Sequence, residues 1–138
     1  MRKPRGIRNH NPGNIRHSAN RWRGMAKDQP DNAFVAFEHP VYGIRALART
    51  LLTYQEKHGL KTIRGMVGRW APTTENDTDA YVDHLSGLLG ISADAPLLLR
   101  TDPHAFGLFV LGIIQHENGQ MPYEKSVVDD AIVLATAA

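Results

Sequence analysis

The stretch AFGLFVLGIIQHENGQMPY, residues 105–123, decides the fold. Its large apolar residues recur at the spacing of one helix face: Phe106, Phe109, Val110, Ile113 and Ile114. Glu117 falls on the same face, one turn beyond the two isoleucines. Asn118-Gly119 then provides a helix stop, with a left-handed residue just past the last turn. The stretch therefore predicts a buried helix that ends in a half-buried carboxylate facing a cleft.

The predicted setting of Glu117 bears on its chemistry. A carboxylate at the inner end of an apolar stripe is costly to ionise, so we expect its pKa to rise toward neutrality. A general acid for glycoside cleavage must be protonated at working pH and still reach a ligand. The alternative is a glutamate that turns to solvent at a frayed helix end. The other glutamates (Glu38, Glu56, Glu75 and Glu124) do not lie on a predicted apolar face.

Length and composition predict one domain over residues 1–138, with residues 1–5 as a flexible basic arm. With 42% hydrophobic and 22% charged residues, wholesale disorder is excluded. The absence of cysteine excludes disulfides and thiolate chemistry. No apolar run reaches the length of a membrane span, and no apolar segment follows the basic N-terminus as in a secretory signal. Delivery outside the cytoplasm would therefore need another route.

The charge is distributed unevenly. The net charge is +2, yet eight of the 16 basic residues precede the first acid, Asp28. Such a segment suits an anionic partner, which would be nucleic acid, an acidic wall polymer or a lipid surface. A solvated terminal arm is the other interpretation.

Patterning predicts a mainly helical α+β domain, with about five helices and a small N-terminal β-element. Ile15-Arg16 and Ala33 to Phe37 are the strand candidates, joined through a turn at Asp28 to Asn32. The five helices begin near Pro40, Ile63, Thr78, Pro103 and Ser126. Thr62, Asp77 or Thr78, and Thr101 or Asp102 are the predicted caps, and Ser126 with Asp129 resembles a capping box.

Several kinds of chemistry lack their motifs. The seven histidines are scattered, without a close pair on a helix face, so no metal site is predicted. No phosphate-binding glycine loop, dinucleotide fingerprint or serine nucleophile elbow is present, and no cofactor is expected. Carboxylate chemistry remains.

Several motifs together resemble a known group of proteins. They are Arg5 to Arg16 with its Asn-Pro-Gly-Asn-Ile run, Trp22-Arg23-Gly24, Phe34-x-x-Phe37, Tyr42 to Ala46, Arg69-Trp70-Ala71-Pro72, Glu75 to Thr78, and Tyr81. This combination, which spans nearly the whole chain, resembles virion-associated proteins of phages and prophages that are similar to lytic transglycosylases of the lysozyme-like superfamily. The resemblance implies a lysozyme-like fold. In most such enzymes the catalytic Glu ends an early helix, whereas Glu117-Asn118-Gly119 comes late, which a circular permutation would reconcile.

The resemblance implies cleavage of the β-1,4 bond between N-acetylmuramic acid and N-acetylglucosamine in peptidoglycan, with Glu117 as the single general acid and base. A hydrolytic route would need a second carboxylate, for which Glu75 and Asp77 are the candidates. The predicted substrate-binding residues are Asn11, Asn14, Arg16, Trp70, Tyr81 and Tyr123. We expect a monomer that acts from a phage virion, or in the host cell wall or periplasm after delivery.

Two other classes of function remain. A non-catalytic relative would lack the family's acid and serve as a virion structural or wall-binding protein. A nucleic-acid-binding protein would use the Arg-rich N-terminal segment, although basic residues thin out after Lys27 and no predicted helix carries a basic stripe. Peptidoglycan is therefore the favoured partner.

Overall fold

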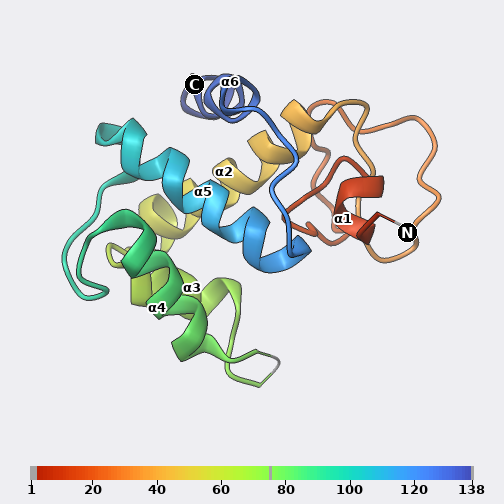
Figure 1. The fold of residues 1–138 in the computed structure, drawn as a ribbon. Helices are drawn as coiled ribbons and strands as arrows, with labels where there is room; N and C mark the ends of the chain where they lie inside the picture. The colour runs from red at the N-terminus through yellow and green to blue at the C-terminus, as the bar shows by residue number, and fades with distance from the viewer. Residues whose placement is uncertain (1–2, 75, 138) are drawn as a thin grey trace.

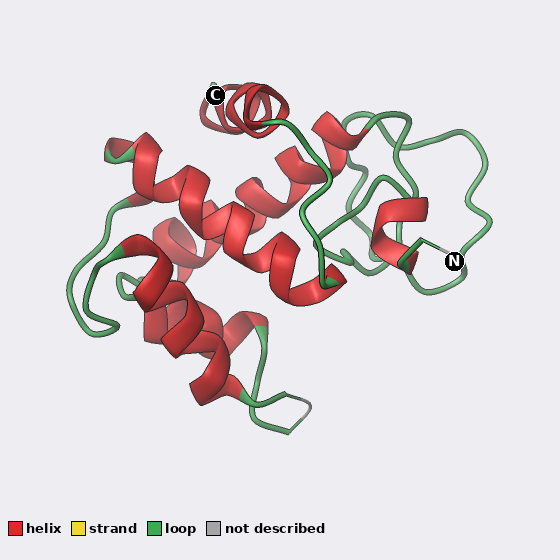
Figure 2. Ribbon diagram, in the orientation of Figure 1, coloured by secondary structure: helices red, strands yellow, loops and turns green. Residues whose placement is uncertain are grey.

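The chain folds mainly into helices, as a computed structural model shows for residues 3–74 and 76–137 (Figures 1 and 2). The described residues form six α-helices and one 3-10 helix: α1 (Arg5–Arg8), α2 (Pro40–His58), α3 (Ile63–Trp70), α4 (Thr78–Leu89), η1 (Leu99–Thr101), α5 (Pro103–Asn118) and α6 (Lys125–Thr136). The five predicted helices are confirmed. Helix α1 was not predicted, because four residues are too few to carry a periodic pattern.

The predicted N-terminal β-element is reduced to two isolated antiparallel bridges, Arg16 with Phe34 and Met25 with Phe37, and Figure 2 draws the segment as loop. Backbone hydrogen bonds join the segments at Val35 N–H to the Ile15 carbonyl and His17 N–H to the Ala33 carbonyl, each at 3.0 Å, and side-chain amides bond further backbone groups. The Gln29 amide bonds both the N–H and the carbonyl of Ala36 at 2.8 Å. Hydrogen bonds of this kind satisfy the backbone without a neighbouring strand.

Helix α5 crosses the middle of the molecule and packs against α4, α6 and α2 (Figure 1). The predicted apolar stripe is confirmed, since Phe106, Phe109, Val110, Ile113 and Ile114 are all 0% exposed. Each such side chain contributes about 1.5–3 kcal/mol on burial. A Cβ on Gly112 would lie 2.1 Å from Leu85, so this glycine lets α4 approach α5 closely.

The Asn-rich loop rests on two helices. On α2, a Cβ at Gly43 would lie 1.8 Å from the backbone oxygen of His10, so the loop backbone lies directly against the helix. On α5, the Asn118 amide donates to the carbonyl of Pro12 at 2.8 Å. The loop that carries the densest sequence motif is therefore held against α2 and the end of α5.

At three of the five predicted helices, the observed N-cap is a residue that the sequence predicted. Thr62, Asp77 and Asp102 each accept a hydrogen bond from a first-turn N–H, at 3.0–3.1 Å. The predicted capping box at Ser126 is wrong. Helix α6 begins one residue earlier, its N-cap Glu124 makes no side-chain cap bond, and Asp129 instead pairs with Lys125 at 2.7 Å.

The first described residues lie beside α1, and the last described residues follow α6. Of the helices in residues 3–74 and 76–137, none combines the length and apolar character needed to cross a bilayer.

The contact between loop and helix at Gly43 gives a test of the fold. Gly43→Ala should lower the free energy of unfolding by about 3 kcal/mol, because the new methyl group meets a backbone atom that cannot move aside. Gly68→Ala in α3, where nothing lies within 4 Å of the added Cβ, should instead raise it by about 0.5–1 kcal/mol. Urea unfolding of both variants measures the effect, and equal stability of the two would contradict this packing.

Candidate functional site

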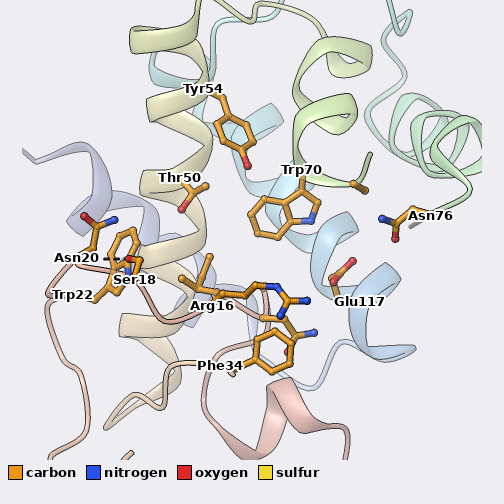
Figure 3. A pocket seen from close by; sticks show the side chains of 14 residues that line it. Arg16, Ser18, Asn20, Trp22, Phe34, Thr50, Tyr54, Trp70, Asn76 and Glu117 are labelled. Atoms are coloured by element: carbon orange, nitrogen blue, oxygen red, sulfur yellow. Dashed lines mark hydrogen bonds between the residues drawn. The ribbon is translucent and has the colours of Figure 1, made fainter. Parts of the chain in front are cut away.

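A cleft of about 520 Å³ opens between the Asn-rich loop and three helices (Figure 3). The loop contributes Asn14 and Arg16, and Phe34 lies next to Arg16. Side chains of α2 (Thr50 and Tyr54), α3 (Trp70) and the residue Asn76 complete the walls, and Glu117 enters from the end of α5. Figure 3 shows Glu117 facing the space between Trp70, Arg16 and Asn76. The cleft is large enough for a small-molecule or sugar ligand.

The carboxyl group of Glu117 is half-buried and hydrogen-bonded. The Tyr81 hydroxyl donates to its Oε2 at 3.2 Å. Burial raises the pKa of Glu117, while hydrogen bonds from Tyr81 and Asn14 act in the opposite direction. Desolvation is the largest of these effects, so the pKa lies above the ordinary glutamate value. The predicted half-buried carboxylate at a helix end is thus present in the fold.

Tyr81, which donates the hydrogen bond to Glu117, is buried beneath the cleft. It is 0% exposed, and its ring stacks on His116 with the centroids 3.7 Å apart. Burial and the neighbouring Glu117 charge raise the pKa of Tyr81, so the hydroxyl stays a proton donor. Burial, together with the nearby His84, lowers the pKa of His116. The group that donates to the Glu117 carboxyl therefore belongs to a stacked Tyr81–His116 pair.

Asn118, the neighbour of Glu117, fixes the end of α5. Its buried amide nitrogen donates to Pro12 at 2.8 Å and to Ile114 at 2.9 Å. Helix α1 closes the same joint, since a Cβ at Gly6 would lie 2.7 Å from the Asn118 Oδ1 and 2.9 Å from the Asn14 Oδ1. The position of Glu117 relative to Asn14 thus depends on residues far apart in the sequence.

Charge in the cleft is sparse. Among its described lining residues, Glu117 is the one carboxylate and Arg16 the one cation. Asp77, a candidate second acid, is not part of this lining, because its carboxylate caps α4 by accepting the Ala80 N–H at 3.1 Å. Glu75, the other candidate, lies outside the described residues.

The predicted binding residues divide between the cleft and other places. Asn14, Arg16 and Trp70 line the cleft. Asn11 does not, because it is 0% exposed and its amide bonds the carbonyls of Ile15 and Val35. Its role is to shape the loop.

Tyr123 is also absent from the described lining of the cleft. It lines a separate, mostly apolar cavity of about 210 Å³ between α5 and α6, where burial raises its pKa to about 12. Tyr123 follows the end of α5 at Gly119 and shares this cavity with Leu108 and Leu111 of the same helix, which do not line the cleft.

Several lining residues were not predicted. The guanidinium carbon of Arg16 lies over the ring of Phe34, 5.0 Å from the ring centre. Asn76 comes from the loop before α4. Thr50 and Tyr54 are one helical turn apart on α2, on the border between its buried and exposed faces. That i, i+4 polar–aromatic pair was the available sequence signal.

A metal centre has no support in this part of the molecule. Across the described ranges, no three histidine, aspartate or glutamate side chains converge as metal ligands would. The imidazole rings of His84 and His116 lie near the site, with their centres 5.9 Å apart.

Comparison with known proteins finds a phage relative. No family model matches the chain. Protein P5 of Pseudoalteromonas phage PM2 is 40% identical to it over 122 residues, which cover 86% of this chain and 74% of that protein.

The raised pKa of Glu117 predicts a pH-dependent contribution to stability. The folded state favours the protonated carboxyl, so wild type should be most stable relative to Glu117→Gln in acid. That advantage should decline as the pH rises through the ordinary glutamate value to the raised one. Urea unfolding of the two proteins across this range measures the difference, and a constant difference would contradict a raised pKa.

Removing the Tyr81 hydroxyl should raise the pKa of Glu117 further, because that group donates to the ionised carboxylate. Carbon-13 NMR titration of the carboxyl groups compares wild type with Tyr81→Phe, using Glu117→Gln to assign the signal. Tyr54→Phe is the matched control, since Tyr54 lines the cleft without bonding Glu117. A lower or unchanged pKa in Tyr81→Phe would show that the hydroxyl does not stabilise the anion.

Proposed function

This chain belongs to the family of Protein P5 of Pseudoalteromonas phage PM2, and we propose that it cleaves peptidoglycan as a lytic transglycosylase or muramidase. The observation that carries the proposal is Glu117, a half-buried carboxyl with a raised pKa at the wall of an open cleft. A perturbed acid in a cleft of ligand size is the usual signature of a general acid.

The proposed reaction begins with neutral Glu117. Its carboxyl proton passes to the glycosidic oxygen as the bond from that oxygen to C1 of N-acetylmuramic acid breaks. The resulting carboxylate then takes the proton of the same sugar's C6 hydroxyl, and O6 bonds to C1. The products are a 1,6-anhydro end and a free hydroxyl on the leaving sugar, and Glu117 is neutral again.

The single-acid route agrees with the charges in the cleft. A hydrolytic route needs a second carboxyl group at roughly 5–9.5 Å from the first, depending on stereochemistry. Among the described lining residues no such partner accompanies Glu117, and Asp77 is engaged at a helix N-terminus. The transglycosylase route is therefore the form of the proposal that we favour.

The remaining cleft residues suit a glycan. Trp70, Phe34 and Tyr54 offer aromatic faces of the kind against which sugar rings stack. Asn14 and Asn76 offer side-chain amides that can exchange hydrogen bonds with N-acetyl groups. A lysozyme-like arrangement, with the acid at a helix end beside a groove, is part of the proposal.

The proposed place of action follows from the phage relative. A protein carried by a virion, or released during infection, meets the wall of the host and would act there or in the periplasm. Peptidoglycan strands are the proposed partner, and the protein needs no cofactor in this reaction.

The decisive variant is Glu117→Gln, which removes the proton donor but keeps the side-chain size. It should fold normally and lose about 10³-fold in the rate of muropeptide release from purified sacculi. Glu124→Gln is the matched control, because Glu124 is an exposed glutamate that makes no side-chain cap bond at the start of α6. Mass spectrometry measures the released fragments, and full activity of Glu117→Gln would remove Glu117 from the mechanism.

The chemistry of the products discriminates among the remaining possibilities. Fragments with 1,6-anhydro ends support the single-acid route, and reducing ends point to hydrolysis with a second carboxylate. If wild type binds sacculi without cutting them, the proposed enzymatic activity is overturned in favour of a virion structural or wall-binding protein. Tight, salt-sensitive binding of DNA without wall binding would favour the nucleic-acid alternative.

A further inference from the structure

A second groove, of about 430 Å³, is lined by five cationic side chains. Two come from the loop that precedes the bridge at Met25, and three come from α2: Arg21, Arg23, Arg45, Arg49 and Lys57. The sequence shows the first two as part of its basic N-terminal segment. The fold adds three cations that lie more than twenty residues further along the chain.

The positive charge of this groove is not neutralised by the described residues around it. None of the five cations takes part in an ion pair within residues 3–74 and 76–137, and no acid is among the lining residues described. Glu56 is close enough to Arg49 to feel its charge, but both of its oxygens bond Arg100. Arg49 itself donates one bond, to the carbonyl of Ala135.

Arg45 shows the electrostatic cost of this arrangement. Burial and the charges of Arg23 and Arg49 lower its pKa, and its Nε is buried without a hydrogen-bond partner among the described residues. Like charges gathered in one groove destabilise the folded protein unless an anion compensates them. A bound anion would relieve that repulsion, and guanidinium groups match carboxylates in geometry.

The groove continues the candidate cleft. Trp22 and Asn20 line both, and Figure 3 shows these two side chains at the far end of the cleft from Glu117. A linear polymer lying in the cleft can therefore pass over Trp22 into the basic groove. The groove thus lies where a further part of the same ligand would be.

We propose that this basic groove binds the free carboxylates of peptidoglycan stem peptides while the attached glycan occupies the cleft beside Glu117. The inference rests on the proposed function, which it deepens by assigning a site to the anionic part of the substrate. Peptide stems branch from the N-acetylmuramic acid residues, so a bound glycan places carboxylates at intervals along the strand.

Two features favour this occupant over a nucleic acid strand. The cations are confined to one groove at one end of the cleft, whereas the cleft itself contributes a single described cation, Arg16, and one acid. A phosphate backbone running along the cleft would lack cations at regular spacing. A branched ligand with a neutral backbone and local anions matches this distribution.

The test measures binding separately from cleavage by using Glu117→Gln protein and purified sacculi. Arg23→Gln with Lys57→Gln removes two exposed groove cations, and we expect about a tenfold loss of affinity for native sacculi. The matched control is Lys27→Gln with Lys61→Gln, which lowers the net charge equally at exposed sites away from the groove. It should bind as Glu117→Gln alone does.

Sacculi whose carboxylates have been converted to neutral amides provide the second arm. Glu117→Gln protein should bind them weakly, and the groove substitutions should cause no further loss. The inference is overturned if the groove variant binds native sacculi normally. It is also overturned if the groove substitutions still weaken binding to amidated sacculi, a result that would assign the groove to phosphates. It is also overturned if a single-stranded oligonucleotide binds more tightly than sacculi through the same two cations.

The two proposals fail in different ways. If wild type releases muropeptides but the groove substitutions do not weaken binding, the proposed enzymatic activity is supported and the proposed carboxylate site is overturned. If the groove substitutions weaken binding but wild type releases no muropeptides, the carboxylate site is supported and the proposed enzymatic activity is overturned. Absence of sacculus binding by Glu117→Gln protein overturns the site, and release by wild type then decides the enzyme.

Discussion

The hydrogen bonds of the Asn118 side chain hold the rest of the site in place. The amide nitrogen is shared between Pro12, in the loop at the other end of the sequence, and Ile114, one turn back in α5. A buried amide that lost these partners would cost about 1–3 kcal/mol, so the helix end and the loop are not free to separate. Glu117 precedes Asn118 directly, and this joint therefore fixes the distance between its carboxyl group and Asn14. The closeness of Gly6 to both asparagines makes α1 part of the same joint.

The carboxyl group of Glu117 is balanced between two opposing influences. Desolvation favours the protonated form, and hydrogen bonds from Tyr81 and Asn14 favour the anion. An acid that must give up a proton and then recover one needs both forms within reach, because each is an intermediate in the proposed cycle. A fully apolar pocket would hold the proton too firmly, and an exposed position would lose it too early. The buried Tyr81, stacked on His116, supplies the donor that keeps the anion accessible.

Sequence predicted those features that depend on neighbours a few residues away. The apolar stripe of α5, the placing of Glu117 at its end and the helix caps are all local, and all are present in the fold. The caps are Thr62, Asp77 of the pair Asp77 or Thr78, and Asp102 of the pair Thr101 or Asp102. The N-terminal segment was expected to form strands, but its backbone pairs at isolated bridges, and side chains such as Gln29 and Asn11 bond further backbone groups, which periodicity does not detect. For the same reason Asn11 was assigned to substrate although its amide is consumed inside the loop. Tyr123 was misplaced because the turn after α5 decides which side it faces.

The distribution of charge separates the cations that we propose to bind an anionic polymer from the acid whose pKa is raised. A cation close to Glu117 would stabilise its anion and lower its pKa, which would remove the proton that the proposed reaction needs. The influences on the pKa of Glu117 are burial, Tyr81 and Asn14, and no cation is among them. The five groove cations instead gather beyond Trp22, at the end of the cleft that Figure 3 shows farthest from Glu117. Salt in the solvent screens the electrostatic interaction of these cations beyond about 8–10 Å. In the proposed mechanism, separation along the cleft lets the groove cations bind the anionic part of the ligand without lowering the pKa of Glu117, which a single mixed site would not.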